Sequence, residues 1–380
     1  MTKKRAKIFL LTVLAAILLF FFLEKSFLPG FLSKLSPDKN FELLGKVIHL
    51  IKNDYVEETN PAKTMKGAFK GLVDSLDILS CYLDKESVLR YSQRKEANLK
   101  DIGVVLYKRY GLFPQVIGIK ENSPASRKGI QIGDYISALD DQSTLMMSMI
   151  ETNLYLKNRN KNPIKLRFFR RAETKEVSVE RTLLFEEPFS YITAKGLSGI
   201  LKIHQLYAPC VRKIKEKIIP RLKPEKMTLI LDLRNCHEGD IGEAVKLINL
   251  FLKAPKIGYF EKKGGIKEIL SCPDDAELEK LPLVIWTNQA TIGPAEAVVG
   301  VLKEFKKAKI IGLPTPGLVA KQNFFLLEDG SGLLLTSGIF HLRSGKKLWE
   351  KGVEPDIKIE REDQSFSSYL KKALHLQPKM

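Results

Sequence analysis

Residues 228–235 read Thr-Leu-Ile-Leu-Asp-Leu-Arg-Asn, and this stretch decides the fold of the second half of the chain. A continuous apolar run of this kind is typical of a strand that is buried on both faces, as in a parallel sheet. The elements expected after it alternate between helix and strand: a helix at 242–252, a strand at 283–287, a helix at 294–305, and short strands at 310–311, 322–326 and 333–336. This alternation predicts an α/β domain, which we place at 187–360.

Short β-rich runs separated by turns fill the region before this domain. They lie at 103–107, 115–120, 135–139, 164–169 and 176–180, with one helix expected at 146–156. Such a series predicts a small β-rich domain, placed at 99–183. Two amphipathic helices are expected earlier, one at 41–53 and one after Pro61, within a helical segment that we place at 37–98. Residues 361–380 are assigned as a C-terminal tail.

The N-terminus has the pattern of a signal anchor. Four basic residues, Lys3, Lys4, Arg5 and Lys7, precede an uncharged and largely apolar run at 8–23. Phe20, Phe21 and Phe22 stand where a cleavage site would need small residues, so an uncleaved anchor at 1–28 is favoured over a removed signal peptide. The positive-inside rule then places the rest of the chain on the extracytoplasmic side, in a periplasm or at the cell surface.

The composition of the chain limits the kinds of partner and cofactor that can be expected. The chain of 380 residues has 62 Lys and Arg against 44 Asp and Glu, a net charge of +18. This charge is spread along the chain and accompanies no nucleic-acid motif, so no nucleic-acid partner is predicted. None of the four cysteines, Cys81, Cys210, Cys236 and Cys272, lies in a C-x-x-C pair, so neither a metal nor another cofactor is predicted. The spacing leaves open whether disulfides form.

Several strings carry a resemblance to a known family. They are 67–77 (GAFKGLVDSLD), 80–84 (SCYLD), 122–136 (NSPASRKGIQIGDYI), 228–235 (TLILDLRN) and 352–357 (GVEPDI). Together they resemble the C-terminal processing, or tail-specific, serine protease family, and the third string resembles a PDZ domain. The resemblance implies a PDZ-like domain followed by a peptidase-type α/β core, behind the helical segment and the signal-anchor helix.

The PDZ resemblance implies a binding site. PDZ domains add an extended C-terminal tail to a sheet edge and capture its carboxylate with backbone N–H groups. By resemblance, the capturing loop contains Ile102, Gly103 and Val104. The expected partners are therefore protein C-terminal tails or unfolded exported proteins. The alternative is that this domain only spaces or gates the next one.

The catalytic residues of the family do not occur at their positions in this chain. Active members use a serine nucleophile and a lysine base, and a glutamine that orients the lysine. Asn288 and Glu296 set the register of the first motif and place Gly293 at the nucleophile position. The second motif places Leu318 at the base position and retains Gln322. Glycine has no nucleophilic atom and leucine accepts no proton.

The expected oxyanion hole is also altered. The residue after Gly293 is Pro294, which has no N–H to donate, and Glu238 puts a carboxylate into the 236–239 turn that supplies the second donor in the family. Gly293 as N-cap, Pro294 as first helical residue and Glu296 as third would turn a strained catalytic turn into an ordinary helix start.

We therefore predict a catalytically impaired pseudoprotease. One alternative is an active serine-type endopeptidase with a relocated site, using Thr291 with Lys321 or Cys236 with His237. Lys321 is expected to face the opposite side of a strand from position 318. The other alternative is a regulatory partner of an active paralogue. The chain is also expected to associate with the membrane through its first helix, and a homo-oligomer remains open.

Overall fold

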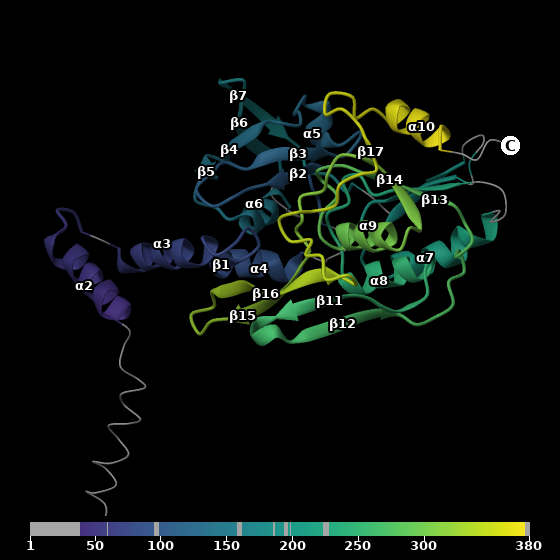
Figure 1. Cartoon of the computed structure of the whole chain (residues 1–380). Coiled ribbons are helices and arrows are strands. Elements are labelled where there is room, and N and C mark those ends of the chain that lie inside the picture. Colours follow the sequence, from purple (N-terminus) through teal and green to yellow (C-terminus); the bar gives the residue numbers. More distant parts are fainter. Residues whose placement is uncertain are drawn as a thin grey trace, which may run out of the picture. The chain divides into compact units, whose positions relative to one another are not determined.

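The computed structural model describes residues 39–58, 60–94, 99–157, 162–184, 187–193, 197, 199–222 and 228–376 (Figure 1). The chain divides into two compact units, residues 1–67 and 68–380. In the described ranges, no helix is both long enough and apolar enough to cross a membrane. The predicted signal anchor at 1–28 lies outside these residues and stays a prediction.

Helix α2 (Lys39–Asp54) belongs to the first unit and has an apolar face with no buried residue. Phe41, Leu43 and Leu50 are among its exposed apolar side chains. Helix α3 (Pro61–Asp74) begins at Pro61, where proline's missing N–H costs nothing, and it runs on into the second unit. Both expected helices are thus present.

The string 80–84 becomes a strand of the peptidase half. Strand β1 (Cys81–Leu83) pairs antiparallel with β16 (Gly332–Leu342). Helix α4 (Lys85–Gln93) follows at once, because the Asp84 carboxylate caps it by accepting the Ser87 N–H at 2.9 Å.

The β-rich domain has one main sheet in the order β2-β3-β4-β6-β7, with β5 beside β4. Its elements are β2 (Val104–Tyr107), β3 (Gln115–Ile119), α5 (Pro124–Arg127), β4 (Tyr135–Leu139), β5 (Gln142–Ser143), α6 (Met149–Leu156), β6 (Ile164–Arg170) and β7 (Glu173–Val179). The five predicted strands, and the helix predicted at 146–156, which corresponds to α6, are confirmed within a few residues. Strand β2 lies at the edge of this sheet, with only β3 paired to it among the described strands.

The α/β domain contains a six-stranded sheet in the order β17-β14-β13-β10-β9-β8, parallel except for the β8–β9 pair. The strands are β8 (Phe189–Ile192), β9 (Gly199–Ile203), β10 (Leu229–Asp232), β13 (Leu283–Thr287), β14 (Ala308–Gly312) and β17 (Ile357–Lys358). All four residues of β10 are buried, as its apolar run predicts. The predicted α/β core is confirmed.

Helices cover both faces of this sheet. Alternate strand residues such as Leu229 and Leu231 pack against α7 (Cys210–Lys217), α8 (Ile241–Asn249) and α9 (Pro294–Glu304). The other set, including Ile230 and Trp286, packs against α10 (Phe366–Leu374). The segment that we assigned as a C-terminal tail therefore contains a helix with buried residues, Tyr369 and Ala373.

A second sheet joins β1, β16, β11 (Ala254–Lys262) and β12 (Lys267–Cys272), and β15 (Ala320–Leu326) pairs with β16 as an antiparallel hairpin (Figure 1). Phe260 and Phe340 of this sheet belong to the same apolar core as α8 and α9. Strand β15 has only β16 beside it, so its other edge is unpaired in the described structure.

A buried ion cluster joins α3 to helix α6 of the β-rich domain. Lys70 of α3 pairs with Glu151 of α6, and its Nζ lies 3.3 Å from Asp74 Oδ2. Asp74 Oδ1 also accepts the Tyr82 N–H at 3.0 Å. Burial raises the pKa of Asp74 from its ordinary 3.8 to about 6, against the opposing effect of Lys70.

This raised pKa predicts a pH-dependent contribution to stability. The folded chain holds the Asp74 proton more tightly than the unfolded chain, so this contribution is largest below pH 4 and is lost as the pH rises through 6. Asp74→Asn removes the titration. Relative to this variant, wild type should gain about 2–3 kcal/mol of unfolding free energy between pH 7 and pH 4 in urea titrations. A difference that does not change with pH would contradict the assignment.

Candidate functional site

The predicted nucleophile position lies at the start of α9. Gly293 is the N-cap, Pro294 follows as the first helical residue, and the Glu296 carboxylate accepts the Gly293 N–H at 3.0 Å. The predicted roles of these residues are confirmed, but the expectation of an ordinary helix start is wrong. Gly293 has φ 63° and ψ −120°, whereas an N-cap normally has extended backbone. The turn therefore has an unusual backbone, and glycine suits its positive φ.

Glu296 fixes the predicted nucleophile and base positions against each other. Its carboxylate is fully buried and also accepts the N–H groups of Gly317 at 2.6 Å and of Leu318 at 2.7 Å. Burial raises the pKa of Glu296, while these hydrogen bonds favour the ionised form. A Cβ atom at Gly293 would lie 3.7 Å from the Leu318 carbonyl oxygen. The two positions are therefore neighbours, as the resemblance implies.

Leu318 lies in an apolar cluster that crosses between the two domains. It is 3% exposed. Its cluster combines residues of the β-rich domain with residues of the peptidase half and the segment before β1: Leu79, Val105, Ile117, Met149, Ala290, Ile292 and Trp349. A lysine here would place an ammonium group among these side chains. Leucine instead lets the position act as packing between domains.

The 236–239 turn carries charge where the family would use backbone donors. Glu238 pairs with Lys157, which follows the C-terminal end of α6. Burial, together with the nearby Lys120 charge, lowers the pKa of Lys157 to about 8. His237 Nδ1 lies 3.1 Å from the Asn235 carbonyl oxygen, and burial followed by Lys120 and Lys157 lowers the pKa of His237 to about 3. This histidine is therefore neutral at physiological pH.

A pocket of about 400 Å³ opens beside Gly293 and Leu318. Strand β2 supplies part of its wall through Val104, Val105 and Leu106, and α6 supplies another part. The peptidase half contributes His237, Glu238 and Gly239, residues 292–294, and the first residues of β15. Among the described residues that line this pocket, none is a serine, threonine or cysteine.

The loop predicted to capture a carboxylate already has one. Asp101 Oδ1 accepts the Ile102 N–H at 2.6 Å and the Gly103 N–H at 3.2 Å. Ile102 and Val104 are buried in the core of the β-rich domain. Whether this loop captures a tail stays a prediction. Asp101 was missed in the sequence, although an acidic residue directly before the loop was a visible signal.

Comparisons with known proteins identify the two domains. The profile of peptidase family S41 matches residues 198–359, and a PDZ domain profile matches residues 100–180. The chain therefore contains a peptidase family S41 region at 198–359 and a PDZ domain at 100–180.

Two curated relatives of this chain are named as proteases. The chain is 28% identical to the carboxy-terminal processing protease CtpA of Bacillus subtilis, over 97% of this chain and 80% of that protein. It is 27% identical to a probable CtpA-like serine protease of Staphylococcus aureus, covering 84% of this chain but only 65% of that protein. A photosystem II D1 C-terminal processing protease shares the fold, with a TM-score of 0.71 at 19% identity over 85% of this chain and 89% of that one.

The relocated sites considered for this S41 core have other roles. The buried Thr291 hydroxyl donates to the Leu233 carbonyl at 2.9 Å and accepts the Asn288 N–H at 3.0 Å. Lys321 pairs with Glu268 at 2.6 Å. The Cys236 thiol is fully buried, and burial raises its pKa, so it is a poor nucleophile. All four cysteines of the chain are buried and free.

Gln322 has a structural partner. Its Nε2 donates to the Leu79 carbonyl oxygen at 2.7 Å, which ties β15 to the segment before β1. The retained glutamine therefore positions the chain rather than a lysine. Leu318 itself precedes β15, so the argument from alternating sides of a strand does not apply to it.

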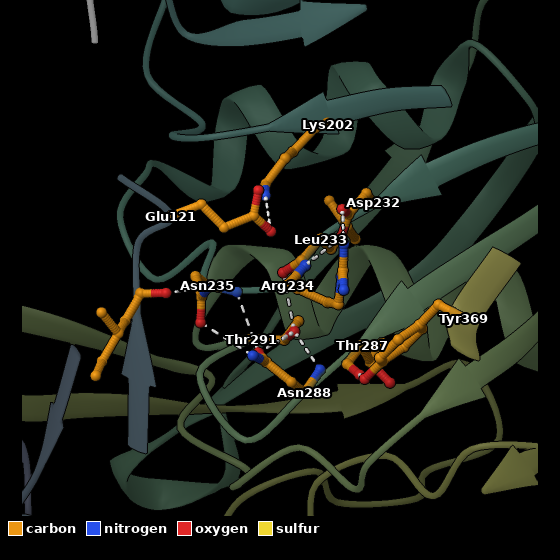
Figure 2. Close-up of polar contacts among 11 residues, drawn as sticks. Glu121, Lys202, Asp232, Leu233, Arg234, Asn235, Thr287, Asn288, Thr291 and Tyr369 are labelled. Atoms are coloured by element: carbon orange, nitrogen blue, oxygen red, sulfur yellow. Dashed lines mark hydrogen bonds and ion pairs between the residues drawn. The ribbon is translucent and has the colours of Figure 1, made fainter. Parts of the chain in front are cut away.

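Asn235 and Asn288 join the S41 core to the PDZ domain. Figure 2 shows their side chains pointing toward each other, with Asn288 Nδ2 donating to Asn235 Oδ1 at 2.9 Å. Asn235 Nδ2 donates to the Ile119 carbonyl oxygen of the PDZ strand β3 at 3.0 Å. The asparagine that set the motif register is thus part of the contact between the domains.

Gly118 of β3 lies directly on this contact. A Cβ atom there would be 2.4 Å from the Ala290 Cβ and 2.5 Å from Asn235 Oδ1. Gly118→Val should therefore lower the unfolding free energy by about 2–3 kcal/mol, because the two domains must move apart. Urea unfolding measures this, with Gly129→Asn, at an open turn where asparagine tolerates the positive φ, as the control. A valine variant as stable as wild type would show that this contact is loose.

Proposed function

We propose that this chain is a non-cleaving S41 protein that binds polypeptide segments of exported proteins in the pocket between its PDZ domain and its peptidase core. The carrying observation is the described wall of that pocket, which has glycine at the nucleophile position, leucine at the base position and no serine, threonine or cysteine. Serine-type hydrolysis needs an activated nucleophile, so these residues leave binding as the retained activity.

Several features support polypeptide as the ligand class. The pocket volume of about 400 Å³ is in the range of ligand sites, and much of its wall is apolar. The edge strands β2 and β15 both contribute residues to it, and an unpaired strand edge accepts an added strand through its backbone. The curated relatives are named as proteases, whose ligands are polypeptides.

The proposal includes an extracytoplasmic location. Its support is the sequence at 1–28, where basic residues precede an apolar run without a cleavage site. The chain would then be held at the membrane by its first helix and meet exported proteins on the far side. Alkaline extraction of isolated membranes, followed by protease accessibility of intact cells, tests this part.

A second candidate function is regulation of an active paralogue or self-association. The observation that favours it is α2, an amphipathic helix without a single buried residue. An apolar helix face of this kind is a common recognition element for another helical surface. Sedimentation of the purified chain, with and without co-expressed S41 proteins, distinguishes a monomer from either assembly.

The main test compares cleavage with binding in one preparation. The full chain, purified in mild detergent, is incubated with a reduced and carboxymethylated protein that has no stable fold. We expect retention of this protein on immobilised chain and no new fragments after overnight incubation. A catalytically competent serine peptidase serves as the positive control for cleavage.

Two results would contradict the proposal. Fragments that appear in proportion to chain concentration, and persist after removal of trace proteases, would show an active site that the described residues do not explain. If the unfolded protein is not retained on the immobilised chain, the proposed binding activity is wrong.

A further inference from the structure

We propose that the pocket holds the C-terminal end of a polypeptide and that Arg94 is the contact for its terminal carboxylate. This inference rests on the proposed function, because it names the chemical group that the same pocket recognises. It differs from the expectation that Ile102, Gly103 and Val104 capture the carboxylate.

Two N–H donors of the PDZ loop, those of Ile102 and Gly103, are already bound by Asp101. Asp101 is 7% exposed, and its carboxylate accepts the N–H groups of Ile102 and Gly103. Burial would raise the pKa of Asp101, but the charges of Lys120 and Lys157 outweigh it and hold the pKa below its usual range. An incoming carboxylate would have to displace this anion from its donors and would be repelled by it. These two N–H groups are therefore not available to a second carboxylate.

The other cationic side chains that line the pocket are paired or neutral. Lys157 is paired with Glu238, and Lys321 is held by Glu268 at 2.6 Å and 2.8 Å. His237 is neutral, because burial and two nearby lysines lower its pKa to about 3. None of these three groups offers an uncompensated positive charge to a ligand.

Arg94 differs from them. It lines the pocket at the end of α4, its guanidinium lies 3.5 Å from the centre of the Tyr91 ring, and its Nη1 donates to the Tyr91 carbonyl oxygen at 2.6 Å. Among the described residues, no carboxylate forms an ion pair with it. Stacking on Tyr91 holds the guanidinium in place, which leaves its other N–H groups for a planar, two-oxygen anion.

The apolar wall completes the ligand class. Val104, Leu106, Met149 and Leu154 line the same pocket as Arg94, and β2 has an unpaired edge there in the described structure. A ligand that fits this pocket would carry an anionic group for Arg94, apolar side chains for the wall and an extended backbone for the edge of β2. The C-terminal end of a polypeptide with apolar last residues has all three. The complementary charge selects the terminus over an internal segment.

Fluorescence anisotropy with the full chain in detergent tests the assignment. The probe is a fluorescein-labelled ten-residue peptide that ends in three apolar residues, made as the free acid and as the C-terminal amide. Arg94→Gln is compared with Arg90→Gln, a variant of the same helix that does not line the pocket. Asp101→Asn reports on the loop.

We expect wild type to bind the acid more tightly than the amide. Arg94→Gln should weaken binding of the acid at least about tenfold and leave binding of the amide unchanged, since a charge-assisted pair typically contributes this much. Arg90→Gln should change neither affinity.

Equal binding of acid and amide, or an acid affinity that does not depend on Arg94, overturns the assignment of Arg94. The proposed binding of peptides would be unaffected by that result. Tighter acid binding by Asp101→Asn, with no effect of Arg94→Gln, would instead show that the PDZ loop at 102–104 binds the terminal carboxylate of the peptide. No binding of either peptide by wild type overturns the proposed function itself.

Discussion

Leu318→Lys is expected to lower the unfolding free energy by about 3–5 kcal/mol. The side chain is buried among Val105, Met149, Ile292 and other apolar residues of both domains. A lysine at this position loses its hydration, and the buried carboxylate of Glu296, which accepts the Leu318 N–H, is already committed to three backbone N–H groups. Urea unfolding followed by circular dichroism measures the loss.

The control for this variant is Leu318→Met, which nearly conserves volume and should cost less than about 1.5 kcal/mol. The lysine penalty should also shrink as the pH rises towards about 10, because a lysine buried without a partner has a depressed pKa and is cheaper to bury when neutral. A lysine variant that matches the methionine variant at neutral pH would show that position 318 has access to water.

Pro294→Ala is expected to have the largest effect on reactivity, in the background Gly293→Ser with Leu318→Lys. Pro294 has no N–H, so this background has both dyad residues but one oxyanion donor fewer than the family uses. Restoring the donor should raise the rate of labelling by a fluorophosphonate about 10²-fold. The measurement is mass spectrometry, over time, of the labelled peptide that contains position 293.

Pro124→Ala in the same background is the matched control, because Pro124 opens α5 in the same way but does not line the pocket. It should leave the labelling rate unchanged. Circular dichroism at the assay temperature must show each variant folded, given the cost expected at position 318. Equal labelling with and without Pro294 would mean that the proline does not limit this site.

The sequence predicted the elements of this fold well, because each has a strong local signal. The apolar run of β10, the alternating runs of the PDZ sheet and the proline starts of α3 and α9 all appear where expected. The registers of the two motifs identified Gly293 and Leu318 as the nucleophile and base positions, and these two residues are neighbours in the folded chain. Ungapped motifs carry this information without any knowledge of contacts.

What the sequence could not provide are contacts between distant segments and the strain of a turn. The positive φ of Gly293 persists because Glu296 binds two turns at once, which no local pattern reveals. Asp101 and Lys157 become significant only when folding brings the PDZ loop, α6 and the 236–239 turn together. Helix α10 was missed although five of its nine residues are apolar, because strand residues that it packs against, such as Ile230 and Trp286, lie far back in the chain.

The apolar cluster around Leu318 affects how this chain unfolds. Val105, Ile117 and Met149 belong to the matched PDZ region, yet their neighbours Ala290, Ile292 and Trp349 lie far outside it. An excised fragment would show these faces to water and be prone to aggregate. Differential scanning calorimetry should accordingly record a single cooperative endotherm for residues 68–380, so the border drawn by homology does not mark an independent folding unit.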